Sequence, residues 1–76
     1  MEIKVYSTPT CPYCKMAKDY LHSKDAPFED IDVSSDNQAA EEMVKISGQM
    51  GVPVVVVDGQ VVVGFDKTRI ETLLNS

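Results

Sequence analysis

Four short runs of β-branched, aromatic and aliphatic residues recur along the chain, and they predict four strands. The first two runs, residues 2–7 and 28–33, alternate apolar with polar positions. The last two, residues 53–57 and 60–63, are rich in valine and are separated only by Asp58-Gly59. A two-residue Asp-Gly link is the strongest short hairpin signal in the sequence, so we expect these two strands to pair antiparallel.

Apolar residues at helical spacing predict three helices between and after these strands. The first should run from Pro12 to near Lys24, the second from the start signal at residues 34–37 to Gly48, and the third should follow Asp66 as its N-cap. The expected core-facing residues are Met16, Ala17, Tyr20 and Leu21 in the first helix, Ala39, Ala40, Met43 and Val44 in the second, and Ile70, Leu73 and Leu74 in the third.

The start of the second helix carries a specific capping signal. Ser35 is followed three residues later by Gln38, which matches a capping box. Asp36 adds a negative charge at the positive end of the helix. We therefore expect the Ser35 side chain to cap this helix.

The resulting order of elements is β-α-β-α-β-β-α, which is typical of an α/β fold. The first β-α-β unit should be a parallel crossover and the last two strands an antiparallel hairpin. The prediction is one domain over residues 1–76, with a four-stranded mixed sheet covered by three helices. The chain contains no internal repeat, linker or low-complexity segment.

Charge and composition exclude several classes of function. The 43% hydrophobic and 25% charged residues are ordinary for a globular domain. The net charge of -5 disfavours a nucleic-acid partner, because a phosphate backbone is bound by clusters of Lys and Arg. No apolar run approaches the roughly 20 residues needed to cross a bilayer, and no signal-peptide pattern opens the chain. We expect a cytoplasmic protein with no membrane partner.

Cys11 and Cys14 are the only cysteines, and they lie where the first strand meets the first helix. Free N–H groups and the helix dipole at a helix start stabilise a thiolate, and thiols there can have a pKa between about 3.5 and 7.5. Lys15, one turn along, is expected to add to this effect. Cys14 lies inside the helix, so we expect Cys11 to attack a substrate disulfide and Cys14 to resolve the mixed disulfide.

Other uses of a cysteine pair remain open. A zinc site needs four protein ligands, or three and a water, which two Cys and one His in a single chain do not easily supply. We therefore expect no metal bound by one chain. Two chains could pool four thiolates around a metal or an iron–sulfur cluster, or the pair could simply pack as small apolar side chains.

At this point the residues resemble the glutaredoxin family, which has the thioredoxin fold. Cys11-Pro12-Tyr13-Cys14 is similar to the dithiol motif of that family, and residues 47–53 resemble its loop before a cis-proline, here Pro53. Gly64-Phe65-Asp66 resembles the turn that holds the glutamyl end of glutathione. The likeness covers essentially the whole chain, and three motifs in the proper order are more specific than a lone Cys-x-x-Cys.

The resemblance implies Cys11 and Cys14 as catalytic residues, no bound cofactor, and glutathione as co-substrate in a monomer that acts on disulfide-containing proteins. The backbone of Val52 should pair with the cysteine part of glutathione. The backbone N–H groups of Phe65 and Asp66 should take its glutamyl carboxylate. The expected substrate- and glutathione-binding residues are Tyr13, Gln49, Val52, Pro53, Gly64, Phe65 and Asp66.

Three positions depart from the glutathione-dependent pattern. Thr8 and Met50 stand where basic residues are usual, and Lys67 follows Asp66 where the family often has a second acid. The turn from Gly64 onward partly resembles the NrdH-type redoxins, which are reduced by thioredoxin reductase. An electron carrier of that type, and a dimeric metal or iron–sulfur binding module, are therefore the two alternatives to a glutathione-coupled oxidoreductase.

Overall fold

The computed structural model of the chain describes residues 1–75. Its elements are β1 (Ile3–Ser7), α1 (Pro12–Ser23), β2 (Glu29–Asp32), α2 (Asn37–Ser47), β3 (Val54–Val57), β4 (Gln60–Val63) and α3 (Lys67–Leu74). The predicted order is confirmed, and each element begins and ends within about one residue of its predicted bounds. Among the described residues, no helix is long and apolar enough to cross a membrane.

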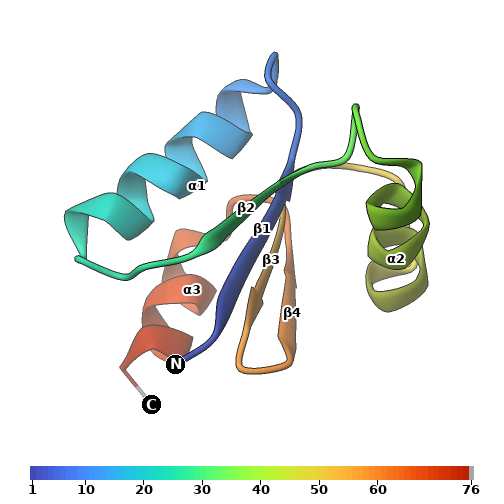
Figure 1. Cartoon of the computed structure of the whole chain (residues 1–76). Helices are drawn as coiled ribbons and strands as arrows, with labels where there is room; N and C mark the ends of the chain where they lie inside the picture. The colour runs from blue at the N-terminus through green and yellow to red at the C-terminus, as the bar shows by residue number, and fades with distance from the viewer. Residues whose placement is uncertain (76) are drawn as a thin grey trace.

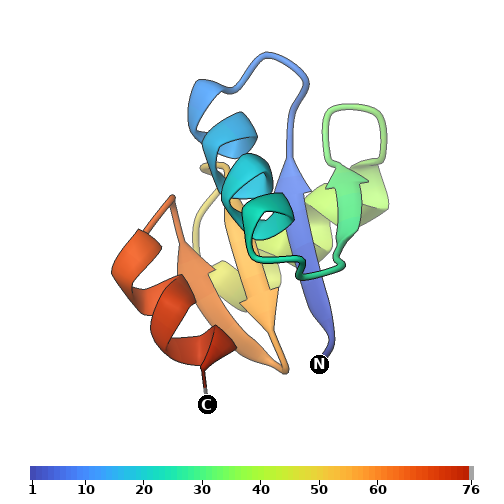
Figure 2. The ribbon, with the colours of Figure 1, turned by 90° about the vertical axis from the view of Figure 1, so that its left-hand side faces the viewer.

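The four strands form one mixed sheet in the order β2-β1-β3-β4. β1 pairs in parallel with β2, with Val5 opposite Asp30, and antiparallel with β3, with Val5 opposite Val55. β3 and β4 pair antiparallel, as expected for the hairpin. Helices α1 and α3 cover one face of this sheet and α2 covers the other (Figures 1 and 2).

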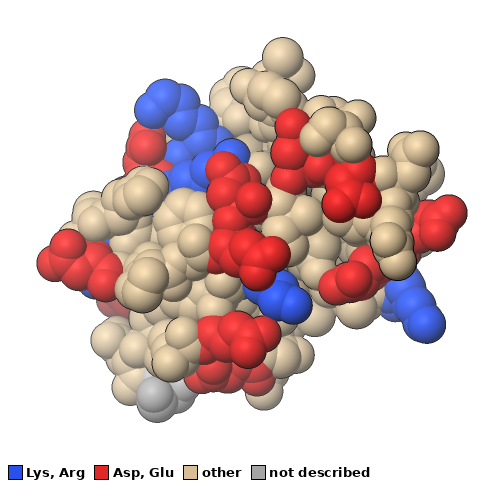
Figure 3. Space-filling view, viewed as in Figure 1, with Lys and Arg blue, Asp and Glu red and all other residues tan. Residues whose placement is uncertain are grey.

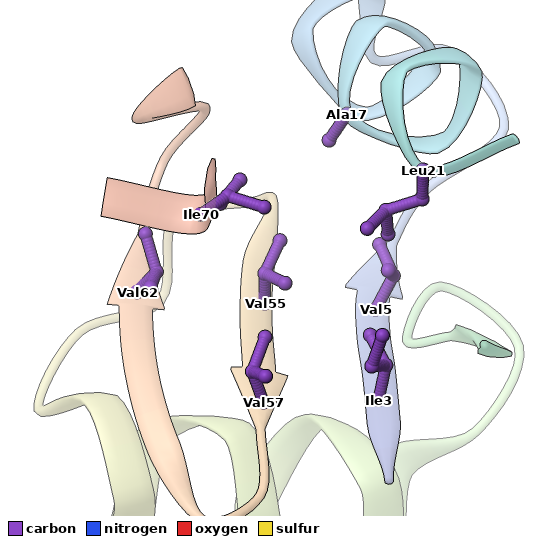
Figure 4. Close-up of a cluster of buried hydrophobic side chains, with 8 residues drawn as sticks. All are labelled: Ile3, Val5, Ala17, Leu21, Val55, Val57, Val62 and Ile70. Atoms are coloured by element: carbon purple, nitrogen blue, oxygen red, sulfur yellow. The ribbon is translucent and has the colours of Figure 1, made fainter. Parts of the chain in front are cut away.

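The main core lies between the sheet and the pair of helices α1 and α3. Side chains of neighbouring strand residues point to opposite faces, so Ile3 and Val5 face these helices while Tyr6 faces α2. Figure 4 shows the buried residues of this core, which are Ile3, Val5, Ala17, Leu21, Val55, Val57, Val62 and Ile70. A smaller cluster on the other face joins Tyr6 and Val54 to Met43 of α2.

A hydrogen bond ties α2 to the central strand. The hydroxyl of Tyr6, whose side chain is buried, donates to Glu42 Oε1 at 2.6 Å. Burial and the neighbouring carboxylate raise the pKa of Tyr6 to about 12. The hydroxyl therefore keeps its proton at neutral pH and remains the donor in this bond.

The hairpin turn lies at the end of the sheet near the start of β1. Asp58 and Gly59 both have a positive φ, 48° and 84°, as a two-residue turn of this kind requires. The N–H of Asp58 donates to the carbonyl of Glu2 at 2.8 Å, and the N–H of Glu2 donates to Asp58 Oδ1 at 2.7 Å. The turn thus extends the pairing of β1 with β3 by one more residue.

The start of α2 differs from its prediction. The N-cap is Asp36, whose Oδ1 accepts from the N–H of Ala39 at 3.1 Å. Ser35 is not the cap, because its Oγ donates to the carbonyl of Asp32 at 3.4 Å within the preceding turn. The N-cap was therefore predicted one residue too early. The predicted end of α2 at Gly48, which has a φ of 77°, is confirmed.

This correction predicts a difference in stability between two neighbouring substitutions. Asp36→Ala removes the acceptor for the Ala39 N–H and is expected to lower the free energy of unfolding by about 1 kcal/mol. Ser35→Ala, as the matched control, should change it by less than about 0.5 kcal/mol. Urea unfolding followed by circular dichroism measures both, and a larger loss for the Ser35 variant would restore Ser35 as the cap.

Two residues expected in the core lie at its border. Met16 is 47% exposed and Val44 is 37% exposed, whereas Ala17, Leu21 and Met43 are buried as predicted. Successive helical residues are rotated by about 100°, so only one member of each adjacent pair points directly at the sheet. The apolar face of each helix is narrower than its sequence pattern indicates.

Candidate active site

The cysteine loop and the proline loop meet at one end of the sheet. The cysteine loop follows the last residue of β1, and Pro53 directly precedes β3. Because β1 and β3 are antiparallel, with Tyr6 opposite Val54, the end of one strand adjoins the start of the other. As a result Cys11 Sγ lies 3.9 Å from the carbonyl oxygen of Val52, although 41 residues separate them.

Cys11 is the N-cap of α1, as the sequence predicts. Its backbone is extended, and its Sγ accepts from the N–H of Cys14 at 3.2 Å. Pro12 occupies the first helical position, where it has no N–H to leave unpaired. The Cys11 sulfur is partly exposed and receives a donor from the helix start, where the dipole also favours negative charge.

Cys14 is the buried member of the pair, with 1% of its surface exposed. Burial, and next the hydrogen bond to the Cys11 sulfur, raise the pKa of the Cys14 thiol to about 11. The backbone N–H of Thr8 and the charge of Lys18 act in the opposite direction and lower this pKa. The structure therefore shows the predicted asymmetry, an accessible Cys11 and a protonated, buried Cys14.

Lys15 is paired with an acidic residue of its own helix. Its Nζ lies 2.7 Å from Asp19 Oδ2, one turn further along α1, and both side chains are exposed. The lysine whose charge lowers the pKa of Cys14 is Lys18, which follows Cys14 by four residues. The spacing of four residues in a helix was the sequence signal for Lys18, because such residues are neighbours on the helix surface.

The Val52–Pro53 peptide bond is cis, as the resemblance implied. Pro53 is buried and Val52 is partly buried, with its carbonyl directed at Cys11. Of the other predicted residues in these two loops, Tyr13 is 62% exposed and Gln49 is exposed. Of these residues, Val52 is the one that the structure shows against the partly exposed Cys11 sulfur.

The turn at Gly64-Phe65-Asp66 adjoins the proline loop. The N–H of Gly64 donates to the carbonyl of Pro53 at 2.8 Å, so the third motif is fixed beside the second. Asp66 is the N-cap of α3, as predicted, and its Oδ1 accepts from the N–H of Arg69 at 3.2 Å. All three sequence motifs therefore lie at the same end of the sheet.

Phe65 is held by an aromatic residue that the site prediction left out. Its ring meets the ring of Tyr20 edge-on, with 6.0 Å between centroids. The Lys67 ammonium lies 5.6 Å from the centre of the same Tyr20 ring. Tyr20 was expected only as a core residue, but its contacts also fix the turn that follows β4.

The two loops that meet at Cys11 carry no charged side chain. Residues 7–14 and 47–53 contain no Asp, Glu, Lys, Arg or His. The most exposed large apolar residue in these loops is Met50, with 82% of its surface accessible. Figure 3 shows an uncharged projection at the top of the view, with basic side chains to its left and acidic side chains spread over the face below it.

No group of three or more His, Cys, Asp or Glu side chains within residues 1–75 is arranged to hold a metal ion. Both cysteines are free thiols. The side chains gathered here can supply one accessible sulfur nucleophile and a second, buried thiol beside it.

Comparison of the sequence with known families and proteins agrees with this geometry. The glutaredoxin family model matches residues 3–62. The chain is 51% identical over 72 residues to an uncharacterized glutaredoxin-like 8.6 kDa protein from the rubredoxin operon of Clostridium pasteurianum, covering 95% of this chain and 96% of the relative. It is 38% identical over 64 residues to glutaredoxin 3 of Escherichia coli K12, covering 84% and 77% of the two chains.

Solved structures show the same fold. The glutaredoxin of Archaeoglobus fulgidus superposes with a TM-score of 0.91 at 29% identity, over 99% of this chain and 87% of its own. The glutaredoxin-like NrdH-redoxin of Escherichia coli, described as having a thioredoxin-like activity profile, superposes with a TM-score of 0.86 at 29% identity, over 96% and 95%. The thioredoxin-like arrangement of three helices on a four-stranded mixed sheet is therefore common to all of them.

Proposed function

The chain belongs to the glutaredoxin family and is a glutaredoxin-like redox protein, and on that basis we propose that it is a thiol–disulfide oxidoreductase whose nucleophile is Cys11. The observation that carries this proposal is the position of the two sulfurs. Cys11 is accessible at the N-cap of α1, and Cys14 is buried beside it with a raised pKa. Only one of the two thiols can then start the reaction.

The proposed reaction has two steps that transfer two electrons. The Cys11 thiolate attacks one sulfur of a protein disulfide or a glutathione mixed disulfide, that S–S bond breaks, and the leaving thiolate takes up a proton. Cys14 then loses its proton and attacks Cys11 Sγ. The Cys11–Cys14 disulfide forms, the second substrate thiol leaves, and the substrate is fully reduced.

We propose glutathione as the co-substrate that reduces this disulfide. Its cysteine part would pair with the backbone of Val52, whose carbonyl lies near Cys11. Its glutamyl carboxylate would lie at the N–H groups of Phe65 and Asp66, at the start of α3, where a helix N-terminus favours an anion. Tyr13, Gln49, Pro53 and Gly64 complete the proposed binding surface.

A second candidate reductant is favoured by the lack of charged side chains in the two loops that meet at Cys11. Glutathione carries two carboxylates, and neither Thr8 nor Met50 supplies the cation that usually meets the glycyl carboxylate. A charged hydrogen bond contributes about 1.5–3 kcal/mol, so its loss weakens binding about tenfold or more. A protein reductant with an apolar docking surface, as for an NrdH-type carrier reduced by thioredoxin reductase, needs no such cation.

Replacing the resolving cysteine separates the two candidates. Reduction of a glutathione mixed disulfide through glutathione needs only Cys11, so Cys14→Ser is expected to keep activity within about tenfold of the natural protein. Turnover is measured with glutathione, glutathione reductase and NADPH, and in parallel with thioredoxin reductase and NADPH. Complete loss with glutathione, together with efficient reduction of the natural protein by thioredoxin reductase, would favour the NrdH-type carrier.

We propose that the protein works as a monomer in the cytoplasm. One chain supplies both sulfurs and all three motifs, and a dithiol centre turns over only where a reductant is present. The mass in solution and the visible absorption of anaerobically purified protein test this assignment. A coloured dimer would instead support the metal or iron–sulfur module.

A further inference from the structure

A linked group of polar side chains joins α1, one turn beyond Cys14, to β2 and β1. Lys18 follows Cys14 by one turn of α1, and its Nζ lies 3.0 Å from Asp30 Oδ2 in β2. Asp30 Oδ1 accepts from Ser7 Oγ at 3.0 Å, and Ser7, the last residue of β1, is 1% exposed. Three elements therefore hold the Lys18 ammonium in place, and its side chain is only 23% exposed.

Among the charged groups near Cys14, Lys18 is the cation that lowers the pKa of its thiol. Lys15 of the same helix is exposed and pairs with Asp19. His22 and Asp25 line one cavity together with Lys18 and Asp30, and neither is among the groups that act on Cys14. From β1 and its loop, Cys14 is met by the Thr8 N–H, and from its own helix by Cys11 and Lys18.

The set of groups that raise or lower the pKa of Cys14 changes during the reaction. In the free dithiol, the Cys11 sulfur raises the pKa of Cys14, both through its hydrogen bond and through its charge. Once Cys11 is bound in a mixed disulfide, it carries no charge and holds no exchangeable proton. Burial then still disfavours the Cys14 thiolate, while the Thr8 N–H and the Lys18 charge favour it.

We propose, building on the function proposed above, that Lys18 is a positioning residue for the second step, in which its ammonium, held by Asp30, favours the Cys14 thiolate that attacks the mixed disulfide. Cys14 releases its proton to solvent, and its thiolate forms a bond to Cys11 Sγ. The bond between Cys11 and the substrate sulfur breaks, and the substrate leaves as a thiolate. Lys18 itself gains and loses nothing in this step.

A chromogenic disulfide separates the two steps in one experiment. Reduced protein is mixed with one equivalent of 5,5′-dithiobis(2-nitrobenzoate), and release of the yellow thiolate is followed by stopped flow. The first release reports attack by Cys11, and the second reports attack by Cys14 on the mixed disulfide. Cys14→Ser calibrates the traces, because it should give the first release alone.

Lys18→Met is expected to slow the second release about threefold at neutral pH. Loss of the ammonium is expected to make the thiolate fraction smaller by up to about tenfold, and the greater nucleophilicity of a more basic thiolate offsets part of this, which leaves about a threefold effect. The first release should stay within about twofold. Between about pH 6 and pH 10, the rise of the second rate should be displaced to higher pH in this variant.

Two further variants keep this test specific. Lys18→Arg retains the charge and should restore the second rate to within about twofold, and Lys15→Met removes an exposed charge of the same helix without slowing it. A second release that is equally fast in Lys18→Met would overturn the proposal, as would equal slowing in Lys18→Arg or an undisplaced pH profile. Failure of the natural protein to give a second release would instead overturn the two-step function itself.

Discussion

Cys11→Ser is expected to lower kcat/KM for any disulfide substrate by at least about a thousandfold. A serine hydroxyl is not ionised near neutral pH, and its oxygen cannot form the mixed disulfide on which both reductant pathways depend. The fold should survive, because serine is a preferred N-cap and its Oγ can accept from the Cys14 N–H in place of Cys11 Sγ. Turnover of a glutathione mixed disulfide measures the loss.

The control for this substitution is an unchanged unfolding curve. If Cys11→Ser unfolds in urea at the same concentration as the natural protein but is inactive, the loss is chemical. If the variant instead keeps more than about a tenth of the activity, Cys14 must be able to start the reaction. That result contradicts the assignment of Cys11 as the nucleophile, because Cys14 is 1% exposed.

Leu21→Ala is expected to have the largest effect on stability. Leu21 has no exposed surface and lies between α1 and the sheet (Figure 4). Truncating a buried leucine typically costs about 2–5 kcal/mol, since it removes apolar contacts and leaves a cavity. At roughly 0.05–0.15 kcal/mol per residue, a chain of this length has only about 4–11 kcal/mol of stability, so this one change removes much of it.

Met16→Ala provides the matched comparison on the same helix. Met16 is 47% exposed, and its truncation is expected to cost less than about 1 kcal/mol. Equilibrium urea unfolding of both variants gives the two free energies. Similar losses would mean that α1 is rotated and that Met16, as its sequence pattern first indicated, faces the core.

The fold could be predicted largely because its signals are local. Asp58-Gly59 with a valine run on each side specifies the hairpin, Gly48 marks a helix end by its positive φ, and Asp66 marks a helix start through its own side chain. The predictions that were wrong concerned the choice between two residues adjacent in the sequence. Ser35 and Asp36 are both good N-caps, and Met16 and Ala17 are both apolar. Contacts with the rest of the chain determine which residue of the first pair caps the helix and which of the second faces the core.

The cysteine pair could be predicted for the same reason, since the N-terminus of a helix determines which sulfur is exposed. The contacts between elements could not. The pairing of Lys18 with Asp30 joins α1 to β2, and Lys18 could not be preferred over Lys15 until β2 was placed beside α1. The bond from Gly64 to Pro53 is different, because it continues the register that the Asp58-Gly59 hairpin sets.

The central position of β1 also determines how the molecule opens. β1 is paired along both edges, with β2 on one side and β3 on the other, whereas β4 is paired on one edge only. Local fluctuations can detach β4 while β1 stays in the sheet, so amide hydrogens of β1 exchange with solvent mainly through global unfolding. Because Cys11 follows this strand after only three residues, we expect the accessible sulfur to be anchored by one of the two strands, β1 and β3, whose amides exchange most slowly.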